Sequence, residues 1–144
     1  MDAPKPIRDG WVTGPLAEAP ACPPFPAFTE FERRALDSTT PLFGENAKAF
    51  REQVATAEVV DRINTSVGFY TRVKVDRAKC SPVPLRQQGA HFEVEGLEHG
   101  LGIVLWDTDG DGFLETIEGY TVDESPLESV DLAKLKFVRL TQLG

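Results

Sequence analysis

The chain has 144 residues, a net charge of −8 and 41% hydrophobic residues, which is typical of one globular domain with a buried core. No apolar run is long enough to cross a membrane, and the first 15 residues lack the apolar segment of a secretory signal. We therefore expect the cytoplasm as its compartment. The acidic balance also argues against nucleic-acid binding, which needs a basic surface.

Charge is distributed unevenly along the chain. Residues 1–88 hold 11 acidic and 12 basic residues, whereas residues 89–144 hold 12 acidic and three basic residues, a net charge of −9. No Lys or Arg stands between Arg86 and Lys134. Self-repulsion within this acidic half (residues 89–144) would be relieved by a cationic partner or a bound cation. The alternative is an acidic surface that serves only solubility.

The first 28 residues contain seven of the 11 prolines. Proline fixes φ and removes an amide donor, which disfavours both a helix and a central strand. We therefore predict two parts: an extended proline-rich arm over residues 1–28 and a single α+β domain over residues 29–144. Apolar residues in the arm, such as Trp11 and Phe25, predict that it lies on the domain.

Two helices are predicted after the arm. Thr29 followed three residues later by Glu32 is the spacing of a capping box, and it predicts a short helix over residues 29–38. A proline and a glycine within residues 41–44 then interrupt the pattern, and a second helix is predicted over residues 45–55. The apolar residues of this second region recur at helical spacing and predict one buried face, formed by Phe43, Ala47, Phe50 and Val54.

After residue 57 the apolar period changes from 3.6 to 2, which predicts strands. Five or six strands are predicted, approximately over residues 59–63, 67–75, 91–97, 101–106, 113–122 and 135–140. Short connections between successive strands indicate antiparallel pairing, and helices at one end of the sequence indicate the α+β class. We expect one mostly antiparallel sheet of five or six strands, with the two N-terminal helices packed on one face.

The stretch from Gly100 to Val122 is predicted to be the central hairpin of this sheet, with an aspartate-rich turn between two apolar strands. The turn has the spacing of a calcium loop, which takes ligands from positions 1, 3, 5, 7 and 12 and has Gly at position 6. The corresponding ligands are Asp107, Asp109, Asp111, the carbonyl of Phe113, and Glu118. Calcium is the one cofactor that the sequence suggests.

The context of this loop favours a hairpin over a calcium site. A calcium loop of this kind belongs between two helices, whereas the flanking segments here have the composition of strands. Asp-Gly is itself a strong hairpin signal and occurs twice in the turn. The leading interpretation is therefore an acidic hairpin tip, and calcium binding is the alternative.

Candidate catalytic groups are few. His91, Glu93 and Glu95 share one predicted strand face, and Cys80 with His91 could form a nucleophile pair, but a solvent-facing strand has the same pattern. No nucleophile-elbow, P-loop, dinucleotide or zinc-protease motif occurs. Cys22 and Cys80 fit two free thiols in a reducing compartment better than a disulfide, which is the alternative. We therefore expect a protein without enzymatic activity and with no catalytic residues.

Three segments carry a resemblance: AEVVDRINTSVGFYTRVKV, HFEVEGLEHGLGIVLW and ETIEGYTVDESP. They resemble a group of small, mostly uncharacterised bacterial proteins with a V-G-F-F/Y strand, an E-G-L-x-x-G-x-G-x-x-L segment and a hairpin ending in L-E-G-Y-T. The match covers about residues 57–126 and implies a single-domain accessory or immunity protein. A single Asp-Gly is usual at the turn of that group, which suggests that Glu118 belongs to the strand motif.

The leading hypothesis is a non-enzymatic cytoplasmic protein that binds a basic protein partner, such as an immunity-type inhibitor that binds a basic toxin. An acidic inhibitor gains association rate with a basic toxin through electrostatic steering. The predicted partner-binding residues are acids of the acidic half: Glu93, Glu95, Glu98, Asp107, Asp109, Asp111, Glu115, Asp123 and Glu124. The sequence leaves the oligomeric state open.

Overall fold

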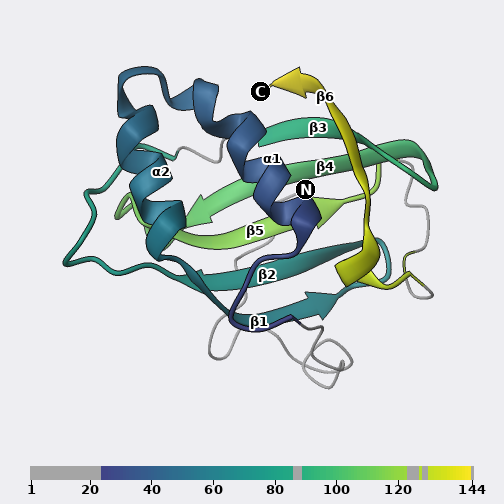
Figure 1. Cartoon of the computed structure of the whole chain (residues 1–144), viewed down its shortest axis with the longest axis horizontal. Coiled ribbons are helices and arrows are strands. Elements are labelled where there is room, and N and C mark those ends of the chain that lie inside the picture. The colour runs from purple at the N-terminus through teal and green to yellow at the C-terminus, as the bar shows by residue number, and fades with distance from the viewer. Residues whose placement is uncertain (1–23, 86–88, 123–126, 128–129, 144) are drawn as a thin grey trace.

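The protein is described here by a computed structural model, which covers residues 24–85, 89–122, 127 and 130–143. These residues form one antiparallel six-stranded sheet with a helical segment across one face (Figure 1), which confirms the predicted α+β class. The strand order is β1-β2-β5-β4-β3-β6. The strands are β1 (Glu58–Asn64), β2 (Gly68–Lys74), β3 (Gly89–Val94), β4 (Leu97–Asp107), β5 (Leu114–Tyr120) and β6 (Phe137–Leu143).

The helical part is a single bent segment between residues 30 and 56. It consists of α1 (Glu30–Thr39), the 3-10 helix η1 (Thr40–Asn46) and α2 (Ala47–Thr56). The prediction of two separate helices is wrong, because helical turns continue through the expected interruption. Pro41 stands in the first turn of η1, where a missing amide donor costs little. Gly44 bends the segment with φ 50° and ψ −120°.

The helix α1 begins where the capping box predicts. Oγ1 of Thr29 accepts the backbone N–H of Glu32 at 3.1 Å, and Oε1 of Glu32 accepts the backbone N–H of Thr29 at 2.9 Å. These bonds satisfy two donors that a helix start would otherwise leave open. With its start fixed, α1 buries Phe31 and Leu36 in the core.

The hydrophobic core lies between the helical segment and the sheet. The ring of Phe31 meets those of Phe69 and Phe92 edge-on, with centroids 6.5 and 5.9 Å apart. In the second part of the segment, Phe43 and Phe50 are buried and stack with centroids 4.2 Å apart, as their spacing predicts. The central strand β4 adds three fully buried side chains: Leu101, Ile103 and Leu105.

The central hairpin is formed by β4 and β5, as predicted, and its two faces have different neighbours. Thr71, Ile117 and Leu105 form one row across β2, β5 and β4, and Thr71 contacts α1 through Glu32. The next residue along each strand points to the opposite side of the sheet. We call that side the second face and define it by Asp61, Tyr70, Arg72, Trp106, Thr116 and Glu118.

A β-bulge in β1 decides which side chains of this strand reach the core. Val59 pairs with Val73, but Asp61 pairs with Arg72, so one extra residue is inserted in β1. Strict alternation would place Asp61 on the side of Val59. The bulge instead turns Arg62 to the helical side and Asp61 to the second face.

Most of the predicted arm, residues 1–23 with Cys22, lies outside the described residues. Its last part contacts the edge strand β1. The carbonyl of Pro26 accepts the N–H of Val59 at 2.6 Å, and the carbonyl of Pro24 accepts a hydrogen bond from Nη1 of Arg62 at 3.0 Å. The residues just before α1 therefore bind the outer strand of the sheet.

Candidate binding face

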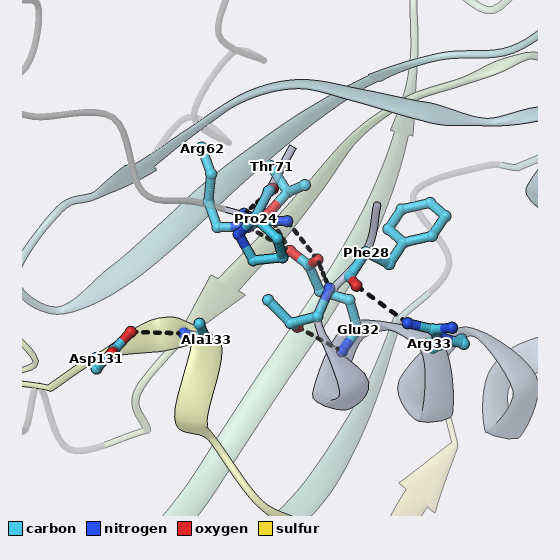
Figure 2. A network of polar contacts seen from close by, with 9 residues as sticks. Pro24, Phe28, Glu32, Arg33, Arg62, Thr71, Asp131 and Ala133 are labelled. Atoms are coloured by element: carbon cyan, nitrogen blue, oxygen red, sulfur yellow. Dashed lines mark hydrogen bonds and ion pairs between the residues drawn. The ribbon is translucent and has the colours of Figure 1, made fainter. Parts of the chain in front are cut away.

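A buried ion pair joins α1 to the sheet. Figure 2 shows Arg62 and Thr71 converging on Glu32 at the start of the helix. Nε of Arg62 donates to Oε2 of Glu32 at 2.9 Å, and Nη2 donates to Oε1 at 2.7 Å. The hydroxyl of Thr71 also donates to Oε2 of Glu32. Arg62 is 0% and Glu32 1% exposed, so this pair lies fully within the protein.

This network is structural rather than a ligand site. Arg62 donates hydrogen bonds to Glu32, to Oγ1 of Thr71 at 3.2 Å and to the carbonyl of Pro24 at 3.0 Å. Glu32 also caps α1 through Thr29. A buried charge of each sign is stabilised only when its partners are in place. The network therefore fixes the helix, the end of the arm and two strands relative to one another.

The aspartates of the turn hold the hairpin tip together. Oδ1 and Oδ2 of Asp107 accept the backbone N–H groups of Gly110 and Gly112 at 3.3 and 2.9 Å. Asp111 accepts the N–H of Phe113 at 3.0 Å and a hydrogen bond from Nη2 of Arg77 at 2.5 Å. Burial would raise the pKa of Asp111, but these bonds, above all that from Arg77, lower it.

A buried glutamine supports the same tip from α2. Nε2 of Gln53 donates to the carbonyls of Ser81 and Gly112, both at 2.8 Å, and its Oε1 accepts the N–H of Leu114 at 2.9 Å. The side chain is 0% exposed. Gln53 could not be recognised as a site residue from the sequence, because an isolated glutamine in a helical pattern does not indicate three distant hydrogen-bond partners.

The predicted calcium ligands are only partly brought together. Asp107 pairs with Leu114 at the end of β4, whereas Glu118 pairs with Val104. Glu118 therefore stands about three residues further along the strand, roughly 10 Å from the tip. Within the described residues, no group of three His, Cys, Asp or Glu side chains is arranged to hold a metal. Calcium binding stays a prediction, and it rests on the three turn aspartates.

The predicted partner-binding acids occupy opposite ends of β4. Glu93, Glu95 and Glu98 lie around the β3–β4 turn, and the turn aspartates lie at the other end of β4. Since β4 has 11 residues, the two groups are roughly 30 Å apart. Asp123 and Glu124 lie outside the described residues. The acids that looked like one surface in the sequence are therefore two separate groups.

Basic residues pair with some of these acids. Nε of Arg139 on β6 lies 2.8 Å from Oε1 of Glu93, and Arg77 pairs with Asp111 as described. Glu95 and Glu98 are exposed. Both ion pairs link a predicted binding residue to a base outside the stretch that lacks Lys and Arg, so they reduce the negative charge of each group.

Glu115, another predicted binding residue, borders an open cleft. The cleft has a volume of about 840 Å³ and lies beside α2, β1 and β2. Its charged lining residues are Glu58, Asp76, Glu115, Lys74, Arg77 and Lys79. Because acids and bases balance in this lining, the cleft offers no net attraction to an ion of either sign.

The candidate catalytic residues do not form one constellation. Nδ1 of His91 lies 2.8 Å from the hydroxyl of Thr141, and Glu93 pairs with Arg139. Cys80 is a free thiol whose Sγ contacts the carbonyl of Asp76 at 3.0 Å. Cys80 and His91 are thus engaged with different neighbours in different elements.

Glu118 occupies the middle of the second face and is half-buried. In the sheet register it stands between Tyr70 of β2 and Val104 of β4, and its Oε1 accepts a hydrogen bond from Nε1 of Trp106 at 3.0 Å. Burial raises the pKa of Glu118, and the Trp106 bond opposes part of that rise. Burial, and next the charge of Glu118, raise the pKa of Tyr70.

The neighbouring row of the second face contains buried polar atoms without partners. Asp61, Arg72, Thr116 and Trp106 are consecutive across β1, β2, β5 and β4. Arg72 and Asp61 form an ion pair of 2.6 Å. Oδ1 of Asp61, Nε of Arg72 and Oγ1 of Thr116 nevertheless have no hydrogen-bond partner. Buried polar atoms are normally satisfied, so three such atoms in one row mark a candidate binding site.

Replacing Glu118 by Gln should stabilise the protein increasingly as the pH rises. The folded protein holds a proton on Glu118 more tightly than the unfolded chain, since its pKa lies above the ordinary 4.5. The stability from this group is therefore complete below the unfolded pKa and is lost as pH rises through the folded pKa. Melting temperatures of both proteins between about pH 4 and 8 measure the difference. A difference in melting temperature that is independent of pH would contradict a raised pKa of Glu118. The control is Glu45→Gln, because Glu45 is exposed.

Comparisons with known proteins give no relative for this chain. No protein-family model matches it, and neither a curated protein nor a solved structure matches it. The resemblance to small bacterial accessory or immunity proteins therefore stays a prediction. Among the described helices, none is both long and apolar enough to span a membrane.

Proposed function

We propose that the chain is a non-enzymatic protein that binds a basic protein through its acidic half, most specifically as an immunity-type inhibitor of a basic toxin in the cytoplasm. The supporting observation is that the three strands within the stretch without Lys or Arg are adjacent in the sheet. β5, β4 and β3 are neighbours in the sheet, and none of the three contains Lys or Arg.

Physical chemistry links this arrangement to a cationic partner. A region of the sheet that carries two acidic groups and no Lys or Arg of its own attracts a positively charged partner and raises the association rate, most strongly at low salt. The exposed Glu95 and Glu98 extend this region at the β3–β4 turn. Cys80 contacts the carbonyl of Asp76, and His91 contacts the hydroxyl of Thr141. That these two candidate catalytic residues have different partners supports a role in binding rather than in catalysis.

Association with a basic protein encoded beside the gene should weaken with salt. We expect the Kd, measured by titration calorimetry, to rise about tenfold or more between low and physiological ionic strength, since screening removes the steering charge. Glu95→Lys with Glu98→Lys should weaken binding further. The matched control is Asp37→Lys with Glu45→Lys, two exposed acids of the helical segment.

Two results would overturn this proposal. One is that no basic neighbour-encoded protein associates at low ionic strength. The other is an association whose Kd does not change with ionic strength, or whose Kd rises equally with both charge-reversal pairs. In either case binding would not depend on the acidic half.

A further inference from the structure

The second face carries a half-buried carboxylate without a basic partner. Among the described residues, no Lys or Arg lies within ion-pair distance of Glu118. The nearest base in the register, Arg72, stands beside Thr116 and is paired with Asp61 at 2.6 Å. The hydrogen bond from Trp106 supplies a dipole but no positive charge. Within the described part of the chain, the negative charge of Glu118 is therefore not neutralised by a cation.

Two hydrogen-bond acceptors without partners lie on the same face of the sheet as this carboxylate. Oγ1 of Thr116 is fully buried and unpartnered, and it lies two residues from Glu118 on the same face of β5. Oδ1 of Asp61 is a second unpartnered acceptor in the adjoining row. A ligand that contacts both Glu118 and Thr116 must therefore present hydrogen-bond donors as well as a positive charge.

An aromatic ring completes the environment. Trp106 is only partly buried, and its indole lies against Glu118 through the 3.0 Å hydrogen bond. Trp is the aromatic residue that attracts cations most strongly through its ring face. A planar cation with several N–H donors suits a carboxylate, a hydroxyl and an indole better than a compact ammonium does.

We propose that the second face binds a guanidinium group, with Glu118 as the counter-ion, Thr116 as an acceptor and Trp106 as the stacking surface. This inference rests on the proposed function and makes it specific, since the guanidinium would be an arginine side chain of the basic partner. Such a residue would be a hot spot, because arginine buried against aromatic and acidic groups dominates many interfaces.

The test uses N-acetyl-arginine amide as the probe and the neutral N-acetyl-citrulline amide as its matched control. The indole N–H signal of Trp106 is followed by NMR. We expect a saturable shift with the arginine probe and none with the citrulline probe. Glu118→Gln should weaken arginine binding about tenfold or more, whereas Glu45→Gln should leave it unchanged. Equal shifts with both probes, or unchanged binding by Glu118→Gln, would overturn the inference.

A second variant separates a binding role from a structural one. Thr116→Val removes an unpartnered buried hydroxyl, so it should keep or raise the melting temperature. The same variant should weaken arginine binding about threefold or more. A lower melting temperature with unchanged arginine binding would mean that Thr116 serves only the fold.

The two proposals fail in different ways. If a basic protein binds with salt dependence but the arginine probe leaves Trp106 unchanged, the proposed function stands and the guanidinium site is wrong. If the arginine probe binds but no basic protein does, the site stands and the proposed function is wrong.

Discussion

Replacing Arg62 by Met should destabilise the protein by about 3–5 kcal/mol, the cost of leaving one member of a buried ion pair without its partner. Arg62 is 0% exposed and makes two hydrogen bonds to Glu32, at 2.7 and 2.9 Å. Without the guanidinium, the Glu32 carboxylate would remain buried beside Thr71. Urea unfolding followed by circular dichroism measures the loss.

A double-mutant cycle identifies the source of this effect. Glu32→Gln should also destabilise, but the double variant with Arg62→Met should cost clearly less than the two single costs added together. This is because the second replacement removes a charge that the first has already left unpaired. Additive costs, or a loss below about 1 kcal/mol for Arg62→Met, would contradict a coupled buried pair.

Replacing Phe31 by Ala should cost a similar amount, about 3–5 kcal/mol. Phe31 is 0% exposed, and its ring contacts three aromatic rings, those of Phe69, Phe92 and Phe137, with centroids 5.9 to 6.5 Å away. Truncation would open a cavity between α1 and the sheet. Thermal and urea unfolding of the variant measure the effect.

Phe25→Ala is the matched control for this cavity. Phe25 is 41% exposed, and it lies 5.8 Å from the guanidinium of Arg62. We expect its truncation to cost less than about 1 kcal/mol. Equal losses for Phe25→Ala and Phe31→Ala would contradict a core centred on Phe31.

The strands could be predicted from the sequence because their signal is local. Alternation from Val67 to Val75 and the apolar run before the turn define β2 and β4 without knowledge of their partners. The capping box at Thr29 is equally local. The group that the sequence resembles usually has a single Asp-Gly at this turn, which suggested that Glu118 belongs to a strand. Glu118 does lie in β5.

The prediction of the helices failed where two local signals were taken as a break. Pro41 and Gly44 do not end the helical segment, because one stands in a first turn and the other only bends the chain. The bulge in β1 could not be predicted from the sequence either. One inserted residue moves Arg62 to the other face of the sheet without changing the composition of the strand. Glu32 was found as a cap but not as the partner of Arg62.

The binding face could not be predicted because it depends on strand order. Sequence proximity placed the acids in one group, whereas the length of β4 separates them into two. The unpartnered polar atoms became visible only when the register placed Asp61, Arg72 and Thr116 in one row across three strands. Pairing between β2 and β5 joins residues more than 40 positions apart, for which the sequence carries no local signal.

The most direct test of this account is amide chemical-shift mapping with a hexa-arginine peptide. We expect saturable shifts concentrated on β4 and β5, with Trp106 and Glu118 among the most affected residues and α1 and α2 little changed. Shifts confined to the helical segment, or the same pattern in the Glu118→Gln variant at equal affinity, would contradict it.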